Sequence, residues 1–130
     1  MIHHRSALIV DDEPAVRNLV AALLTRAGFH ADVVQTGDEA IKRFEERVYD
    51  VAIIDLIMPG KEGIETMIEI RRRWPGSKVI MMSGGGRIGP REILDLAAAL
   101  GAHATVSKPF TSADLLGMVE SVLVDHHRAA

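Results

Sequence analysis

The sequence predicts an α/β domain in which a doubly wound, five-stranded parallel sheet carries helices on both faces. Short apolar runs alternate with helical patterns five times along the chain, an order typical of parallel strands joined by right-handed crossovers. Several of these runs are apolar without interruption, as in strands buried on both faces. The chain has 130 residues, of which 48% are hydrophobic. We therefore expect residues 1–130 to form one domain with a core of its own.

The first strand–helix unit places the first acidic side chains. The apolar run ALIV stops at Asp11, Asp12 and Glu13, and we expect Glu13 to belong to the first helical turn. Pro14 suits that turn, where its missing N–H is not needed, and Gly28 suits the end of the helix, where a positive φ is favoured. The apolar residues at helical spacing, which we expect to face the core, are Val16, Leu19, Val20, Leu23, Leu24 and Ala27.

The next two units have the same order. We predict a strand at 31–35, a helix at 36–48, a strand at 50–55 and a helix at 62–73. The sequence of the second of these strands, DVAIID, is typical of a strand buried on both faces. The helical residues expected to point inward are Ala40, Ile41, Phe44, Ile64, Met67 and Ile68.

The last two units complete the sheet. Strands are predicted at 78–83 and 103–107, and a helix at 91–100 is closed by Gly101. A final helix runs from Ser112, its predicted N-cap, to about residue 124. No stretch rich in proline, glycine and serine divides the chain into two domains.

Charged and polar side chains follow four predicted strands, at the edge where open α/β sheets bind ligands. They are Asp11, Asp12, Asp55, Ser83 and Lys108. Carboxylates about 4 Å apart repel by about 1 kcal/mol in water and by several times that near a protein surface. Mg²⁺, which prefers oxygen ligands, offsets such repulsion. A lysine suits a phosphoryl oxygen or a carboxylate, and an aspartate can itself be a nucleophile that forms an aspartyl-phosphate.

Four motifs in this order resemble the receiver domain of two-component response regulators, the CheY-like family. ALIVDDEP resembles the first strand and acidic pair of that family, and DVAIIDLIMPGKEG resembles its phosphorylation segment around Asp55. Ser83 stands where the family has Ser or Thr, and KPF at 108–110 stands where it has lysine and proline. The resemblance covers nearly the whole chain. It implies a flavodoxin-like fold with strand order 2-1-3-4-5 and a cis Lys108–Pro109 bond.

The resemblance also implies a role for each site residue. Asp55 is expected to accept a phosphoryl group, and Ser83 and Lys108 to contact that group after transfer. Mg²⁺ is the expected cofactor. Asp12 is expected to bind it directly, and Asp11 directly or through water. The full set of expected metal ligands is Asp11, Asp12, Asp55 and the backbone carbonyl of Ile57.

Partners and output follow from the same resemblance. The phosphodonor is expected to be a histidine kinase or a histidine phosphotransfer protein, and the output a changed surface on the fourth helix, fifth strand and fifth helix that a downstream protein reads. A homodimer is compatible with this scheme. The chain is expected to be a phosphoacceptor with at most self-phosphorylation and autodephosphorylation, and not otherwise an enzyme.

One position departs from the family pattern. The family commonly has an aromatic switch residue three places before the lysine, whereas this chain has Thr105 there. Ser83 and Thr105 are therefore the expected switch residues, with Thr105 filling less space than an aromatic ring. The departure keeps open a second interpretation, a receiver-like binding or dimerisation module that no longer depends on phosphorylation.

Other classes of protein fit the sequence less well. The glycines of MMSGGGRIGP match G-x-G-x-x-G, but they follow the fourth strand and have no acid about 20 residues later, which argues against a dinucleotide site. We expect a loop that moves with Ser83. A magnesium-dependent phosphatase would need a second acid where Ile57 stands, and a flavin binder would need a phosphate loop after the first strand, where acids lie.

Composition limits the location and the partners. The net charge of −3 provides no basic field for nucleic acid. No apolar run is long enough to span a membrane, no signal-peptide core is evident, and cysteine is absent. We therefore expect a cytoplasmic protein that does not bind nucleic acid directly.

Overall fold

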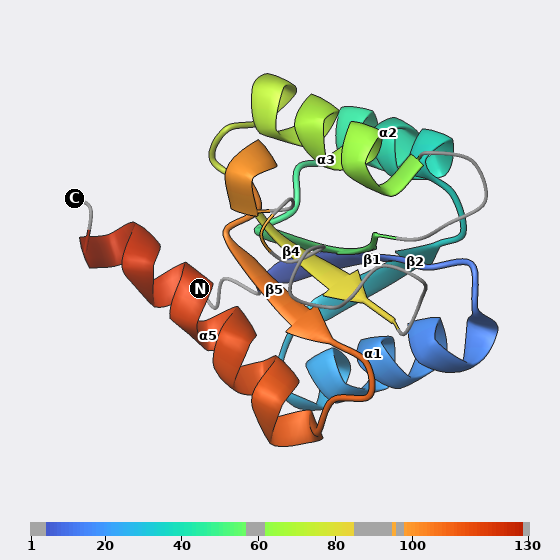
Figure 1. The fold of residues 1–130 in the computed structure, drawn as a ribbon, viewed down its shortest axis with the longest axis vertical. Helices are drawn as coiled ribbons and strands as arrows, with labels where there is room; N and C mark the ends of the chain where they lie inside the picture. The colour runs from blue at the N-terminus through green and yellow to red at the C-terminus, as the bar shows by residue number, and fades with distance from the viewer. Residues whose placement is uncertain (1–4, 57–61, 85–94, 96–97, 129–130) are drawn as a thin grey trace.

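Five parallel strands form a single sheet in the order β2-β1-β3-β4-β5 (Figure 1). The computed structural model describes residues 5–56, 62–84, 95 and 98–128, and the fold is stated for those residues. The predicted doubly wound sheet and its strand order are confirmed. In chain order the elements are β1 (Ser6–Val10), α1 (Pro14–Arg26), β2 (His30–Val34), α2 (Gly37–Glu46), β3 (Val51–Asp55), α3 (Glu62–Arg73), β4 (Lys78–Ser83), β5 (Ala104–Ser107) and α5 (Ser112–Arg128).

Each central strand buries alternate side chains against two different helix pairs. In β1, Leu8 and Val10 belong to the core cluster under α2 and α3, while Ala7 and Ile9 belong to the cluster under α1 and α5. Figure 1 shows these two pairs on opposite sides of the sheet. Burying one leucine or isoleucine stabilises the fold by about 1.5–3 kcal/mol. The central strands are therefore the most firmly held part of the molecule, and their carboxyl ends form a rigid edge.

The buried faces of helices α1 and α3 are narrower than the apolar pattern of the sequence predicts. Val20 and Leu24 of α1 are fully buried, but Leu19 is 54% exposed, so its predicted place in the core is wrong. In α3, Ile68 is 44% exposed and Ile70 is buried instead. A helix resting on a sheet covers only one stripe of its surface, and the flanking apolar positions remain available for other contacts.

Threonine side chains cap two helices. The Oγ1 of Thr36 accepts a hydrogen bond from the Glu39 N–H, at 3.2 Å, at the start of α2. The Oγ1 of Thr111 accepts one from the Asp114 N–H, at 3.0 Å, at the start of α5. The prediction that Ser112 is the N-cap is therefore wrong, because the capping side chain comes one residue earlier.

Two glycines end helices as expected. Gly28 follows α1 with φ = 97°, and Gly101 precedes β5 with φ = 117°. Both lie in the region that glycine enters without steric penalty. The predicted helix at 91–100 lies mostly outside the described residues, as do positions 85–89 of the glycine-rich loop. The structure extends α5 to Arg128, beyond the predicted end near residue 124.

A histidine side chain completes the hydrogen bonding where β5 begins. The Val79 N–H of β4 donates to Nδ1 of His103 at 3.0 Å, and the His103 N–H donates to the Val79 carbonyl at 2.9 Å. The ring thus takes the place of a strand carbonyl that β5 does not yet supply. Burial, followed by the positive charges of Arg71 and Lys78, lowers the pKa of His103 to about 4.

The lowered pKa of His103 predicts acid-sensitive stability. An unfolded histidine has a pKa of about 6.5, so between about pH 6.5 and 4 the unfolded chain binds more protons, and the free energy of unfolding falls as pH falls. We expect a loss of about 1 kcal/mol at pH 5 for this half-buried ring. Urea unfolding at several pH values measures it. His103→Asn keeps an acceptor for Val79 but does not titrate, so an unchanged pH dependence in that variant would contradict the assignment.

Candidate functional site

The predicted site residues lie at one edge of the sheet. Asp11 follows β1, Asp55 ends β3 and Ser83 ends β4. Lys108 follows β5, the strand paired with β4. The register places Val10 beside Ile54 and Asp55 beside Met82, so the strands reach this edge together. Carboxyl ends of adjacent parallel strands meet in this way in open α/β sheets.

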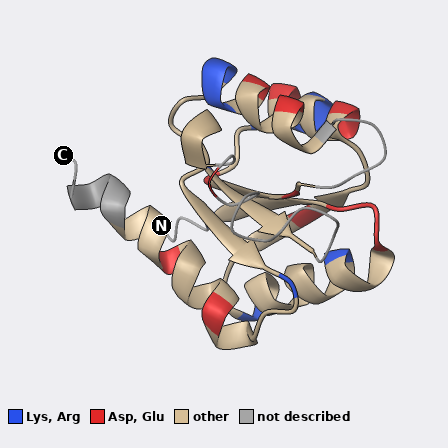
Figure 2. Ribbon diagram, viewed as in Figure 1, with Lys and Arg blue, Asp and Glu red and all other residues tan. Residues whose placement is uncertain are grey.

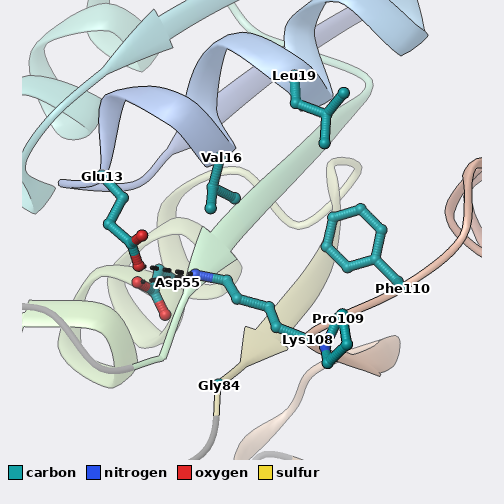
Figure 3. Close-up of a pocket in the computed structure, with 8 residues that line it drawn as sticks. All are labelled: Glu13, Val16, Leu19, Asp55, Gly84, Lys108, Pro109 and Phe110. Carbon is teal, nitrogen blue, oxygen red and sulfur yellow. Dashed lines mark hydrogen bonds and ion pairs between the residues drawn. The ribbon is translucent and has the colours of Figure 1, made fainter.

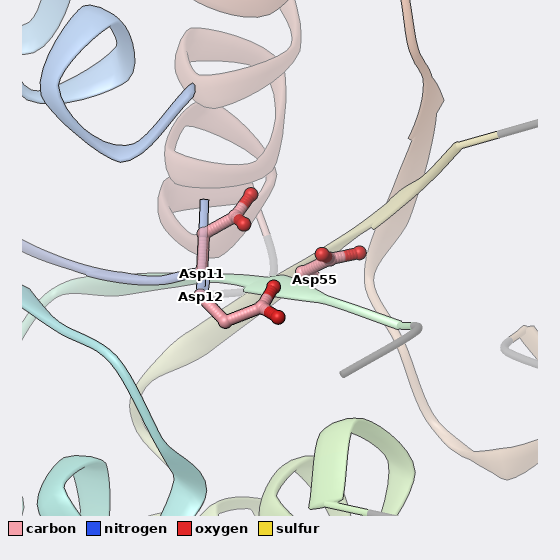
Figure 4. A group of neighbouring side chains, drawn as sticks. All are labelled: Asp11, Asp12 and Asp55. Atoms are coloured by element: carbon pink, nitrogen blue, oxygen red, sulfur yellow. The ribbon is translucent and has the colours of Figure 1, made fainter. Parts of the chain in front are cut away.

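Three carboxylates come together at this edge (Figure 4). One oxygen from each of Asp11, Asp12 and Asp55 lies within 4.8 Å of the others. Asp11 and Asp55 are buried, at 0% and 4% exposure, and Asp12 is exposed. Negative charges this close repel each other, and burial strengthens the repulsion. The arrangement therefore requires positive charge nearby.

Lys108 supplies part of that charge. Its Nζ lies 3.0 Å from Oδ2 of Asp11 and 3.4 Å from Oδ2 of Asp55. It also lies 3.9 Å from Oε1 of Glu13 (Figure 3). Burial alone would lower the pKa of Lys108. The hydrogen bond that Lys108 donates to Asp11 and the charges of Asp55 and Asp11 outweigh burial and raise that pKa. Lys108 is therefore a fixed cation at any physiological pH.

Backbone groups fix the orientation of Asp11. The Glu13 N–H donates to Oδ1 of Asp11 at 2.9 Å, while Oδ2 accepts from Lys108. The Arg17 guanidinium donates to the Asp11 carbonyl at 3.0 Å. Both carboxylate oxygens of Asp11 are thus engaged, so this side chain is held in place at the base of the cluster. Asp12, which is exposed, presents its carboxylate to solvent.

Ser83 brings a buried hydroxyl to the end of β4. Its side chain is 2% exposed, and its Oγ has no hydrogen-bond partner among the described residues. The Ser83 carbonyl accepts from the Lys108 N–H at 2.7 Å, which ties the two strand ends together. A buried hydroxyl without a partner costs about 1–3 kcal/mol. The hydroxyl is therefore available to an acceptor that enters the site.

Gly63 allows α3 to begin directly against the site. A Cβ at this position would lie 2.5 Å from the Asp55 carbonyl oxygen and 2.6 Å from that of Leu56. Both are backbone atoms, which cannot move aside as a flexible side chain does. Gly63 was part of the predicted phosphorylation segment, but the sequence did not reveal this close approach.

An apolar groove opens beside the acids (Figure 3). It has a volume of about 550 Å³ and lies between α1 and the segment that follows β5. Leu19, Val16 and Phe110 form its apolar wall, and Asp55 lies at one end with Lys108. The residues that line it are Glu13, Val16, Leu19, Asp55, Gly84, Lys108, Pro109 and Phe110.

The structure brings most of the predicted site residues together. The three aspartates and Lys108 form one cluster, and Ser83 ends the neighbouring strand. Thr105 is half-buried within β5, where it pairs with Met81. Ile57 lies outside the described residues. The predicted cis bond between Lys108 and Pro109 is present. The apolar groove was missed, because helical periodicity had assigned Leu19 to the core.

Comparisons with known proteins place this geometry in a family. A family model described as the response regulator receiver domain matches residues 7–120. The chemotaxis protein CheY of Halobacterium salinarum is 31% identical over 119 residues, which cover 92% of this chain and 97% of that protein. An NtrX-like response regulator of Rickettsia felis is 36% identical over 111 residues. That alignment covers 84% of this chain but only 23% of the longer relative.

Solved structures agree with the sequence comparisons. A CheY-like response regulator receiver domain protein from Methanospirillum hungatei superimposes with a TM-score of 0.88 at 26% identity. The match covers 98% of this chain and 100% of that one. Among the described residues, no helix combines the length and apolar character needed to cross a bilayer.

The contact at Gly63 predicts a costly substitution. Gly63→Ala places a methyl group against the backbone of Asp55 and Leu56, and we expect it to lower the free energy of unfolding by about 1–3 kcal/mol. Gly117→Ala is the matched control, because nothing lies within 4 Å of an added Cβ inside α5. This control should raise stability by up to about 1 kcal/mol. Urea unfolding distinguishes them, and equal effects would contradict the close approach.

Proposed function

Because this chain belongs to the family of response regulator receiver domains, we propose that it accepts a phosphoryl group on Asp55 in a two-component signalling system. The observation that supports this most strongly is the cluster of Asp11, Asp12 and Asp55 beside Lys108. We propose further that residues 1–130 act as one receiver domain. Its donor would be a histidine kinase or a histidine phosphotransfer protein, and its target a downstream protein.

Asp55 is the proposed nucleophile. One of its carboxylate oxygens would attack the phosphorus of a phosphohistidine, forming a P–O bond as the P–N bond breaks. The imidazole would leave with the electron pair of the P–N bond and take up a proton. Asp55 is held at the carboxyl end of a buried strand, so it presents its oxygens with little loss of conformational freedom. Positioning and charge stabilisation are the main contributions of a protein to phosphoryl transfer.

The acidic cluster fits Mg²⁺. Its oxygen donors lie close enough to share one hard cation, and Mg²⁺ commonly uses one or two carboxylates, several waters and phosphate oxygens. Asp12 would bind the ion directly because its carboxylate faces solvent. Asp11 would bind the ion through a water molecule, or directly after releasing Lys108. Asp55 would be the third carboxylate ligand. The backbone carbonyl of Ile57 is the remaining proposed ligand. The ion would neutralise negative charge that develops on the transferring group.

Lys108 and Ser83 are the proposed phosphoryl contacts. A phosphoryl group on Asp55 would compete with Asp11 for the Lys108 ammonium, because it carries more negative charge. The Ser83 hydroxyl would donate to a phosphoryl oxygen and gain the hydrogen-bond partner that it lacks within the described ranges. Thr105, half-buried two residues before the end of β5, is the proposed second switch position. We propose that the surface of β5, α5 and the helix predicted at 91–100 carries the signal to a downstream protein. A homodimer formed through this surface is one such output.

The apolar groove is the proposed docking surface for the phosphodonor. It begins at Asp55 and Lys108 and continues along α1 to Leu19. A helix that carries a phosphohistidine could thus place its apolar side chains against Leu19, Val16 and Phe110 while the phosphoryl group reaches Asp55. Exposed apolar residues next to a reactive group are typical of interaction surfaces. Acting in this way, the chain needs no nucleic-acid contact and no membrane, consistent with a cytoplasmic role.

Phosphorylation tests the acceptor. With Mg²⁺ and acetyl phosphate, intact mass should rise by one phosphoryl group, and Asp55→Asn should abolish the gain. Chelating Mg²⁺ should slow it by at least about 100-fold. Asp38→Asn, an exposed acid in the first turn of α2, is the control and should be phosphorylated normally. Phosphorylation that survives Asp55→Asn would contradict the assignment. A folded protein that takes up no phosphoryl group would favour the phosphorylation-independent binding module.

Docking is tested by comparing two phosphodonors. Leu19→Gln removes apolar contact from the groove, and we expect transfer from a phosphorylated histidine phosphotransfer protein to slow about tenfold. Transfer from acetyl phosphate, which needs no docking, should not change. Val48→Gln is the matched control because Val48 is 58% exposed and lies outside the groove. If Leu19→Gln leaves the protein donor unaffected, or slows both donors equally, the groove is not the docking surface.

A further inference from the structure

A group of basic side chains lies at the amino end of β5, at the opposite end of that strand from Lys108. His103 precedes β5, Lys78 begins β4, and Arg71 lies in the last turn of α3. In Figure 2 this last turn, at the upper end of α3, is blue. The positive charges of Arg71 and Lys78 both act on the His103 ring. No carboxylate is among the groups that act on it in the described part of the chain.

Hydrogen-bond geometry fixes the tautomer of His103. The Val79 N–H can only donate, and it points at Nδ1. Nδ1 is therefore unprotonated, and the proton of the neutral ring lies on Nε2. Nε2 in turn faces the Arg71 Nη1 at 3.3 Å. A guanidinium has no acceptor, so two N–H donors face each other across this contact.

Arg71 differs from its neighbour Arg73 in having no acidic partner among the described residues. Arg73 pairs with Glu45 and Glu69, both at 2.8 Å. Arg71 forms no ion pair with a described carboxylate, and its Nε is buried without a hydrogen-bond partner. The carboxyl end of α3 favours a cation through the helix dipole, but it provides no acceptor between Arg71 and His103. A buried donor without a partner is destabilising.

From this arrangement we infer that Arg71, His103 and Lys78 form a binding site for an oxyanion of the phosphate or carboxylate class. An oxyanion has several acceptor lone pairs, so one oxygen could accept from both Arg71 Nη1 and His103 Nε2, which otherwise face each other as donors. Lys78 adds positive charge on the neighbouring strand. Charge-assisted hydrogen bonds to arginine are among the stronger polar contacts in proteins. This site is separate from the acidic cluster, because it lies at the amino ends of β4 and β5 whereas the cluster lies at the carboxyl ends of β1 and β3.

NMR titration with inorganic phosphate tests the site, in the absence of Mg²⁺ and at constant ionic strength set with chloride. The Arg71 Nε–Hε and His103 ring resonances should shift and saturate. The pKa of His103 measured from its ring carbons should rise in phosphate, because a bound anion favours the protonated ring. A parallel titration with acetate shows whether the site prefers phosphate or also binds carboxylates. Saturation with phosphate alone indicates a phosphate ligand, and saturation with acetate indicates a site that also accepts carboxylates.

Two variants complete the test. Arg71→Gln should weaken phosphate binding at least about tenfold, whereas Arg72→Gln, an exposed neighbour in the same turn, should bind as the unmodified chain does. Measurements on the unmodified chain are sufficient to overturn the inference. Shifts that rise linearly without saturation for both anions, or an unchanged His103 pKa in phosphate, would show that no site exists. Saturable shifts that persist in Arg71→Gln would place the anion elsewhere.

Discussion

The contact between one lysine and two buried carboxylates is the interaction on which the rest of the site depends. The strand order puts β1 beside β3, so Asp11 and Asp55 reach the same edge of the sheet whatever their charges. Rigid packing on both faces prevents the strands from moving apart. Lys108, which follows the edge strand β5, offsets the repulsion between the two carboxylates. Removing it would take the ammonium contact away from two buried carboxylates, Asp11 and Asp55, which is destabilising.

The same contact explains why the site is suited to a reversible charge change. Lys108 already has two acceptors, Asp11 and Asp55, and its raised pKa keeps it charged. A phosphoryl group would therefore not need to bring its own cation. It would redirect one already present, while Ser83 contributes a donor that has no other use among the described residues. The packing at this edge holds these groups close together in the absence of a phosphoryl group.

Sequence reasoning placed Asp11, Asp55 and Lys108 at one edge because they lie at the ends of strands, and parallel strands bring their carboxyl ends together. It failed where burial, capping or hydrogen bonding depends on residues that are distant in the sequence. Leu19 continues a regular apolar pattern, but α1 buries only Val20 and Leu24 fully, and no local pattern shows which side of a helix stripe meets the sheet. Thr111 and Ser112 are both residue types that cap helices, and the sequence does not show at which of them α5 starts. The role of His103 required knowing that Val79 lies beside it.

A crystal structure with Mg²⁺ and beryllofluoride, a phosphoryl mimic, would show whether Lys108 leaves Asp11 for a group on Asp55. We expect beryllium joined to an Asp55 oxygen, Mg²⁺ held by Asp12 and Asp55, and the Lys108 ammonium moved from Asp11 onto fluorine. Ser83 Oγ would then donate to a second fluorine. Binding of the mimic to another side chain would rule out Asp55 as the acceptor. Binding to Asp55 with Lys108 still on Asp11 and no new partner for Ser83 would rule out the proposed roles of Lys108 and Ser83.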